Sequence, residues 1–200
     1  MFKIIILGCG PGHPDYILPL TKKKALGLDL LLGSPRLLKL FPDFAGQKVE
    51  LKSPLQEGLS FLAQSRLRSR CGVLVSGSPL RFSLASLVIK TFGQEECEVV
   101  PGISVADLAL SRLGLVGKQI GYFSVHGRKK NFDLSTLLPF EVVVVFLDKD
   151  LNWLDQEMFE HFTWTLLEDL GLPSERIQEI NYPHLPKYQG LALLVGVKRI

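Results

Sequence analysis

The feature that most constrains the fold is a pattern that occurs three times in the first half of the chain. A short apolar run ends in a turn rich in glycine or proline, and a helix-like segment follows. The three turns are Gly8-Cys9-Gly10-Pro11-Gly12, Ser76-Gly77-Ser78-Pro79 and Pro101-Gly102. This alternation is typical of a mostly parallel β-sheet with both faces covered. Because ligands of such sheets bind beyond the carboxyl ends of the strands, we expect the turns to gather at one edge and form a site built from loops.

The apolar runs also predict where the elements lie. In the first half we expect strands over 3–7, 29–32, 49–52, 72–75 and 98–100, and helices over 54–70, 84–92 and 104–113. After Gly117 the pattern changes, and it predicts strands over 119–125, 142–147, 176–182 and 191–197 with one long helix over 151–170. The sequence therefore predicts an α/β fold with an N-terminal α/β domain, residues 1–114, and a smaller C-terminal α/β domain, residues 115–200.

Composition excludes several classes of protein. The chain has 200 residues, of which 46% are apolar and 22% charged, as in an ordinary globular protein. A net charge of +3 is too small to indicate a nucleic-acid partner, although it suits a small anionic substrate. The three cysteines and the isolated histidines show no spacing typical of disulfides or of a metal site. No apolar run approaches the roughly 20 residues of a membrane span, so we expect a cytoplasmic protein with no membrane partner.

The first glycine turn has two possible roles. Glycine lets backbone N–H groups approach a ligand closely, but a glycine turn after a strand is often only a tight turn. The dinucleotide fingerprint G-x-G-x-x-G is incomplete, because His13 takes the third glycine position and Pro11 stiffens the turn. A nicotinamide-binding protein is therefore a distant alternative, even though Asp29 lies at about the right spacing for the acidic ribose partner.

The other two turns each bring a serine to the end of a strand. Ser78 and Ser104 are both candidates to cap the helix that follows, and Pro79 is a candidate first residue of its helix. Capping and ligand contact are compatible, so the hydroxyl groups remain candidates for both. Three such turns in one half of the chain favour a ligand site more strongly than any one of them.

A basic segment, Ser124-Val125-His126-Gly127-Arg128-Lys129-Lys130, ends the first expected strand of the second domain. Arginine pairs with carboxylates through two hydrogen bonds, so this segment suits a ligand that carries carboxylates. Basic runs of this kind are usually solvated turns, and the residues alone favour that interpretation. No spacing in the chain indicates a Ser/His/Asp set, a Cys/His set or a pair of catalytic carboxylates.

Taken together, these segments resemble the tetrapyrrole methylase family. The resemblance rests on residues 8–14, 76–80 and 100–104 in that order, and it extends from Met1 to about Asp148. Within the family, Ser124-Val125-His126-Gly127-Arg128 and the stretch from Asp15 to Thr21 resemble the branch that methylates carbon 5 of a cobalt-precorrin.

The resemblance implies two α/β domains of tetrapyrrole methylase type, with the cofactor S-adenosyl-L-methionine in the cleft between them. The cofactor contacts that it implies are Pro11, Gly12, Gly77, Ser78, Leu80, Arg81, Ser104, Val105 and Leu147. His126 and Arg128 would orient an anionic tetrapyrrole, cobalt-precorrin-7, as the catalytic residues. It further implies a homodimer and a separate carbon-15 methyltransferase/decarboxylase as partner.

One departure from the family pattern leaves alternatives open. The family usually has Asp where this chain has Ser78, which keeps the ability to form hydrogen bonds but loses a charge. The affinity for the cofactor and the rate of turnover both depend on that difference. The alternatives are a related methylase with another substrate, and a degenerate, non-catalytic binding module or scaffold for the carbon-15 enzyme.

Overall fold

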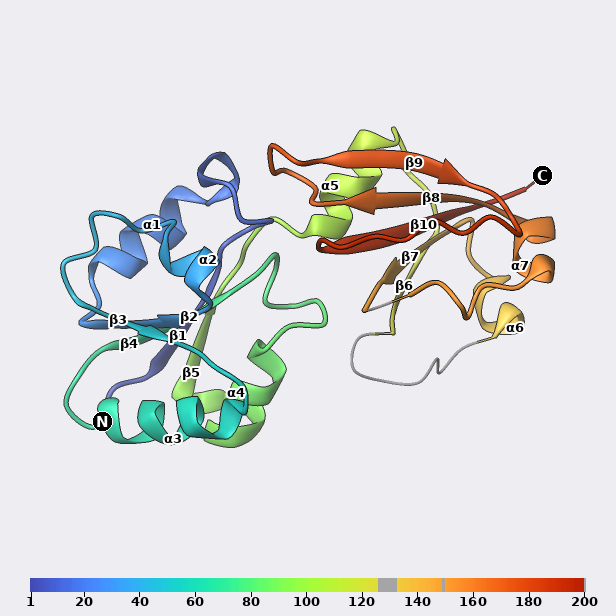
Figure 1. Cartoon of the computed structure of the whole chain (residues 1–200). Helices are drawn as coiled ribbons and strands as arrows, with labels where there is room; N and C mark the ends of the chain where they lie inside the picture. The colour runs from blue at the N-terminus through green and yellow to red at the C-terminus, as the bar shows by residue number, and fades with distance from the viewer. Residues whose placement is uncertain (126–132, 149, 200) are drawn as a thin grey trace. The chain divides into compact units, whose positions relative to one another are not determined.

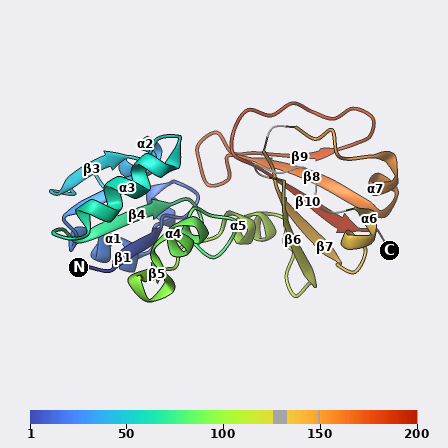
Figure 2. The same ribbon diagram turned by 90° about the horizontal axis from the view of Figure 1, so that it is seen from below.

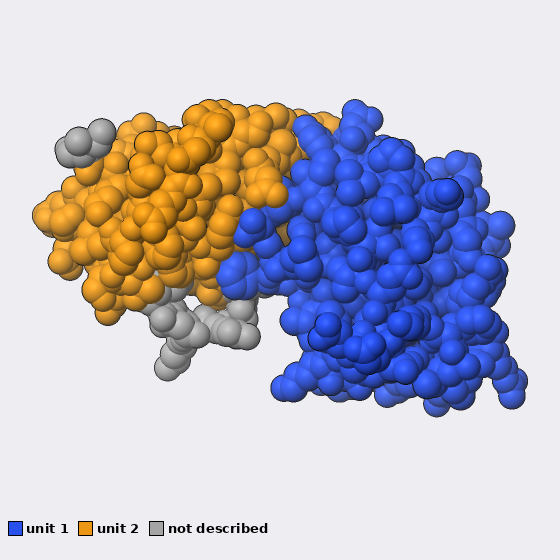
Figure 3. Space-filling model, turned by 180° about the vertical axis from the view of Figure 1, so that it is seen from behind, with its two compact units in different colours: residues 1–105 blue, residues 106–200 orange. Residues whose placement is uncertain are grey.

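The computed structural model describes residues 1–125, 133–148 and 150–199. The chain forms two compact units, Met1–Val105 and Ala106–Ile200, which Figure 3 shows in different colours. The sequence pattern placed the domain boundary after residue 114, which assigns the helix over 104–113 to the first domain. The two compact units divide just after Val105, the first residue of the helix there, and the domain bounds stay a prediction. Each unit is described by itself below.

The first unit contains a sheet of five strands, all parallel (Figure 1). The strand order is β3-β2-β4-β1-β5. The strands are β1 (Ile4–Gly8), β2 (Leu30–Gly33), β3 (Gln47–Glu50), β4 (Cys71–Val75) and β5 (Cys97–Val100). The predicted parallel sheet is thus confirmed, and all five strands begin and end within two residues of their expected positions.

Helices cover both faces of this sheet, with α1 and α2 on one face and α3 and α4 on the other, as Figures 1 and 2 show. Successive strand residues point to opposite faces, so Ile4 and Ile6 pack with Leu62 and Val88, whereas Leu7 packs on the other face. The helices are α1 (Pro19–Leu26), α2 (Pro35–Leu38), α3 (Leu55–Ser65) and α4 (Ala85–Phe92), with short 3-10 helices η1 (Pro14–Tyr16) and η2 (Gln94–Glu96).

The connections of the neighbouring strands β1 and β4 run in opposite directions. The chain leaves β1 through α1 toward β2, and it leaves β4 through α4 toward β5. These two helices lie on opposite faces of the sheet. Such a reversal opens a crevice beyond the carboxyl ends of the two strands, which is where ligands bind in open α/β sheets.

The second unit contains a mixed sheet of five strands in the order β6-β7-β10-β8-β9. The pair β6 and β7 is parallel, and the other three pairs are antiparallel. The strands are β6 (Ile120–Ser124), β7 (Val142–Phe146), β8 (Phe162–Glu168), β9 (Arg176–Ile180) and β10 (Ala192–Lys198), and the helices are α5 (Val105–Arg112), α6 (Leu134–Leu137) and α7 (Gln156–His161).

The long helix expected over 151–170 is wrong. Only α7 forms there, and the chain then enters β8, which lies between β10 and β9. Along β8, Phe162, Trp164 and Leu166 are fully buried, while Thr163 and Thr165 are partly exposed. Aromatic and β-branched residues that alternate in this way suit a strand, and pairing on both sides of β8 overrides any helical spacing of the apolar residues.

Among the helices in the described part of the chain, none is both long enough and apolar enough to span a membrane.

Candidate functional site

The three turns predicted from the sequence meet at the carboxyl edge of the first sheet. Gly77 N donates a hydrogen bond to Gly10 O at 2.7 Å, and Gly10 N donates to Gly77 O at 3.3 Å. A Cβ atom on Gly8 would lie 2.6 Å from Gly102 N, and one on Gly102 would lie 2.5 Å from Gly77 O. The turns after β1, β4 and β5 therefore pack backbone against backbone, which confirms that they gather at one edge.

The end of the first turn is held by a residue that the sequence analysis missed. Arg36, in the short helix α2 that follows β2, donates from Nη1 to Pro11 O at 2.8 Å and from Nη2 to Ser76 Oγ at 3.0 Å. Gly12 has φ +114°, and a Cβ atom there would overlap Nη1 of Arg36. The signal that could have indicated this residue is the segment Gly33-Ser34-Pro35, which repeats the glycine-serine-proline pattern of the turn after β4.

Ser78 shapes the second turn and does not cap α4. Its side chain is nearly buried, 9% exposed, and its Oγ accepts a hydrogen bond from Leu80 N at 3.3 Å. The expected cap at Ser78 and helix start at Pro79 are wrong, because α4 begins only at Ala85, whose N–H donates to Ser83 Oγ. The turn exposes the side chain of Leu80.

Further residues complete this edge. Arg81 N donates to Ser78 O at 3.2 Å, so the backbone of Arg81 belongs to the second turn. Ser104 is buried directly before α5, and Val105 N lies 3.8 Å from the place of a Cβ atom on Gly77. The structure thus brings together eight of the nine predicted cofactor contacts, namely Pro11, Gly12, Gly77, Ser78, Leu80, Arg81, Ser104 and Val105. Their role in binding stays a prediction.

The first turn and the first helix add two buried groups beneath the edge. Thr21 Oγ1, from α1, donates to Gly8 O at 3.2 Å. Cys9 is fully buried and its Sγ donates to Leu7 O, and burial raises the pKa of the thiol to about 12. Because a thiolate is needed for nucleophilic attack, burial and the raised pKa argue against Cys9 as a nucleophile. The hydrogen bonds of these two groups support the turn.

Several expected residues lie elsewhere. Leu147 belongs to the second unit, where it is buried in the core and its N–H donates to Ala192 O at 3.2 Å. His126 and Arg128 lie outside the described residues. Asp29 precedes β2 at the amino edge of the first sheet, where it forms an ion pair with Arg70 at 2.7 Å. Asp29 is therefore not placed to bind the ribose of a nicotinamide cofactor at the carboxyl edge. Within the described part of the chain, the nicotinamide-binding alternative has no acidic residue in the position it requires.

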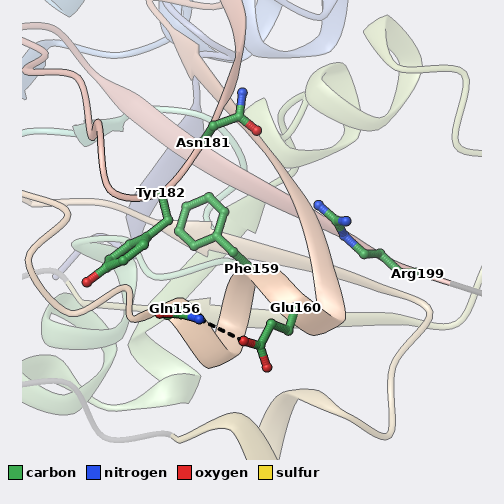
Figure 4. Close-up of a pocket in the computed structure, with 6 residues that line it drawn as sticks. All are labelled: Gln156, Phe159, Glu160, Asn181, Tyr182 and Arg199. Carbon is green, nitrogen blue, oxygen red and sulfur yellow. Dashed lines mark hydrogen bonds between the residues drawn. The ribbon is translucent and has the colours of Figure 1, made fainter.

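The second unit has a small, open pocket of about 330 Å³, shown in Figure 4. Gln156 Nε2 donates to Glu160 Oε1 at 3.0 Å in its lining, and the rings of Phe159 and Tyr182 pack at 5.9 Å between centroids. The lining residues are Gln156, Phe159, Glu160, Asn181, Tyr182 and Arg199. None of them is among the site residues that the sequence predicts.

The chemistry available at the carboxyl edge is that of binding and not of proton transfer. Residues 8–12, 76–81 and 101–105 supply backbone N–H and C=O groups and serine hydroxyls, and their sequence contains no histidine and no carboxylate. Arg36 and Arg81 are the cations that α2 and the second turn bring to it. Such an edge can hold and orient a ligand by many short polar contacts.

Comparison with known proteins agrees with this geometry. Residues 3–185 match the family model of the tetrapyrrole (corrin/porphyrin) methylases. The cobalt-precorrin-7 C(5)-methyltransferase of Salmonella typhimurium is 28% identical over 130 residues, which cover 65% of this chain and 64% of that protein. The match thus spans slightly less than two thirds of the relative's length.

Two solved structures have a similar fold. The precorrin-6Y methylase of Archaeoglobus fulgidus has a TM-score of 0.80 at 20% identity, with 99% of both chains covered. The uroporphyrin-III C-methyltransferase of Thermus thermophilus, in complex with S-adenosylhomocysteine, has a TM-score of 0.70 at 19% identity, with 98% of this chain and 97% of that one covered. Because the family model matches residues 3–185 of its 200 residues, the chain belongs to the tetrapyrrole (corrin/porphyrin) methylase family.

Proposed function

We propose that this protein is a methyltransferase that uses S-adenosyl-L-methionine to methylate carbon 5 of cobalt-precorrin-7 in the synthesis of cobalamin. The observation that carries the proposal is the meeting of three glycine turns at the carboxyl ends of β1, β4 and β5 in a member of this family. The choice of carbon 5 is supported by the name of the Salmonella typhimurium relative and by the segment Ser124–Arg128.

The residues of the edge fit this cofactor. Gly77 has φ +66°, and a Cβ atom there would have nothing nearer than Val105 N at 3.8 Å, so the backbone is open to a close ligand. The backbone groups and serine hydroxyls of the three turns are uncharged donors and acceptors, which suits the polar adenosine groups of the cofactor. A pyrophosphate fits less well, because the first turn leads into the 3-10 helix η1 and not directly into the N-terminus of an α-helix.

The cofactor supplies a methyl group on a sulfonium, which is already an activated electrophile. The acceptor carbon of a reduced tetrapyrrole is electron-rich, so the protein has to position it and has little need of a strong base. Holding two reactants in a reactive geometry can lower a barrier by roughly 7–11 kcal/mol. This explains why the turns carry hydroxyls and backbone groups where other enzymes carry an acid and a base.

The substrate carries many carboxylates, and the cations of the chain are the proposed anchors for them. Arg81 lies on the second turn, and the basic segment adds His126, Arg128 and Lys129. We expect Arg128→Ala to weaken substrate binding and to lower turnover while leaving cofactor affinity unchanged. Unchanged turnover and substrate affinity in that variant would remove Arg128 from the proposed site.

Titration with S-adenosylhomocysteine by calorimetry tests the cofactor site directly. We expect about one site per chain, and a large loss of affinity in Gly77→Val. The matched control is Gly93→Val, since Gly93 also has a positive φ, +95°, with open space around it, but lies between α4 and η2. Both substitutions place a β-branched residue at a positive φ and therefore strain the backbone. An equal loss of affinity in both would show that the carboxyl edge has no special role.

The product decides between the proposal and its alternatives. Incubation with cobalt-precorrin-7 and ¹³C-methyl-labelled cofactor should give one labelled methyl group, which NMR assigns to carbon 5. A label at another position, or on another acceptor only, supports a related methylase. Binding of S-adenosylhomocysteine without any turnover supports the degenerate binding module, in which Ser78 has replaced the usual Asp. The homodimer and the carbon-15 partner remain predictions, which light scattering and co-purification can test.

A further inference from the structure

Arg36 reaches the carboxyl edge from an element that carries none of the three glycine turns. It lies in α2, which begins at Pro35 directly after β2 and Ser34. β2 is the neighbour of β4 in the sheet. The side chain therefore extends from a fourth strand end toward the turns after β1 and β4.

The guanidinium group of Arg36 connects two of those turns. Its Nη1 donates to Pro11 O in the turn after β1, and its Nη2 donates to Ser76 Oγ at the end of β4. A planar guanidinium presents its donors at fixed angles, so two acceptors on different segments are held at a fixed separation. A lysine ammonium is a single point on a flexible stem and cannot span both acceptors in the same way.

The position of Gly12 supports the same arrangement. The space that a side chain at residue 12 would take is already filled by Nη1 of Arg36. The charge of Arg36 also reaches into the turn, because it acts to lower the pKa of Cys9 against the larger, opposite effect of burial. The absence of a side chain at Gly12 thus leaves the space that the guanidinium group of Arg36 fills, so the first turn and this side chain are packed together.

We infer that Arg36 is a positioning residue, which holds the Pro11-Gly12 end of the first turn in the conformation that binds the cofactor. It acts through the backbone of that turn and through Ser76, and not by chemistry of its own. This inference rests on the proposed function, because it assigns the turn to the cofactor. Its consequence is that cofactor affinity depends on a side chain outside the glycine turns.

The first experiment compares Arg36→Ala, Arg36→Lys and the control Arg70→Ala by calorimetry with S-adenosylhomocysteine. We expect Arg36→Ala to weaken binding at least tenfold and Arg36→Lys to restore only a small part of the loss. Arg70→Ala removes an exposed arginine ion pair at the amino edge of the same sheet and should leave affinity unchanged. In steady-state assays the Arg36 variants should raise the KM for the cofactor more than they lower kcat.

A double-mutant cycle separates positioning from a general structural role. Gly12→Ala should displace the guanidinium and weaken binding in the wild-type chain, and in the Arg36→Ala background only the part of the loss caused by strain at φ +114° should remain. Ser76→Ala, which removes only the acceptor of Nη2, should weaken binding by a few fold and be likewise non-additive with Arg36→Ala. Additive effects in both cycles would overturn the inference.

The outcomes also separate this inference from the proposed function. If the wild-type chain does not bind S-adenosylhomocysteine, the proposed function fails. If the wild type binds and Arg36→Ala binds equally well, only the role of Arg36 fails. If Arg36→Ala does not fold by circular dichroism, the Ser76→Ala variant and Arg36→Lys still decide, because unchanged affinity in both would contradict the inference.

Discussion

The two sheets of this protein each have five strands but use side chains in opposite ways. In the first unit the parallel strands end in turns that pack backbone against backbone, as Gly8 and Gly102 show. In the second unit the strands are mostly antiparallel, and one face is filled by large side chains such as Phe162 and Trp164. The absence of side chains opens an edge for a ligand in the first sheet, whereas side-chain volume builds a core in the second.

Glycine has a different role in each sheet. Gly102 in the first unit lets one backbone segment approach another, because a Cβ atom would lie 2.5 Å from Gly77 O. Gly196 in the second unit pairs across strands with Trp164, and a Cβ atom there would lie 2.6 Å from the indole ring. The first glycine makes room for main chain and the second makes room for a side chain. A substitution in the first sheet should therefore displace backbone segments, whereas one in the second should displace a side chain of the core.

The largest effect is expected for Trp164→Ala in the second sheet. Trp164 is fully buried and its Nε1 donates to Met158 O at 3.1 Å, so the variant loses packing and leaves a carbonyl without its partner. We expect the free energy of unfolding of this unit to fall by roughly 3–5 kcal/mol. Urea unfolding followed by circular dichroism measures it. Thr165→Ala, on the partly exposed face of β8, is the control, and an equal loss there would contradict the assigned face.

The same strand shows why part of the second unit could not be predicted from the sequence. The apolar residues of 151–170 fit a helical spacing, but Phe162 to Leu166 also alternate between buried and partly exposed positions. Which pattern prevails depends on β9 and β10, which pair with β8 from later in the chain. Local spacing does not contain that information, whereas β1, β2 and β4 of the first unit are short, continuous apolar runs that end in glycine turns.

The second prediction concerns backbone packing in the first sheet. Gly102→Ala would bring a methyl group against Gly77 O and Gly8, and main-chain atoms cannot move aside as a flexible side chain can. We expect a loss of roughly 1–3 kcal/mol in the stability of the first unit and weaker binding of S-adenosylhomocysteine. Gly27→Ala is the control, because its Cβ atom would meet only Lys24 O at 3.5 Å.

The tryptophans allow the two units to be followed separately. Both tryptophans of the chain, Trp153 and Trp164, lie in the second unit. Gly102→Ala should therefore shift the unfolding transition seen by circular dichroism more than the one seen by tryptophan fluorescence. Equal shifts in both signals would mean that the units unfold as one and that their separation has no thermodynamic consequence.

The candidate site was only partly predictable for a related reason. The three turns are visible in the sequence because glycine and proline follow apolar runs directly. Arg36 was missed because its partners, Pro11 and Ser76, lie far from it along the chain and meet it only in the folded sheet. The helix expected over 84–92 agrees with α4, and the capping role expected for Ser78 was wrong because six turn residues separate it from the start of that helix.

The smallest effect is expected from substitution of surface carboxylates. Measured at acid pH, it allows the stabilities of the two units to be compared. Hydrogen bonds from Arg70 lower the pKa of Asp29 to about 2 in the first unit, and the N–H of Gln119 with Lys118 lowers the pKa of Glu141 in the second. A carboxyl whose folded pKa lies below its unfolded value, about 4, stabilises the fold above that value. That stabilisation is lost as the pH falls through the folded pKa.

Asp29→Asn should therefore flatten the decline in stability of the first unit between about pH 4 and pH 2. Glu141→Gln should do the same for the second unit. Both groups are exposed, so 0.5 M salt should reduce each effect, as it does for surface ion pairs. Thermal melts at several pH values, followed by circular dichroism and by tryptophan fluorescence, measure the two units in parallel. Asp29→Asn could alter the fluorescence transition as much as the circular dichroism transition. Acid would then unfold both units in one cooperative equilibrium. The contrast between the two sheets would in that case concern their architecture and not their stability.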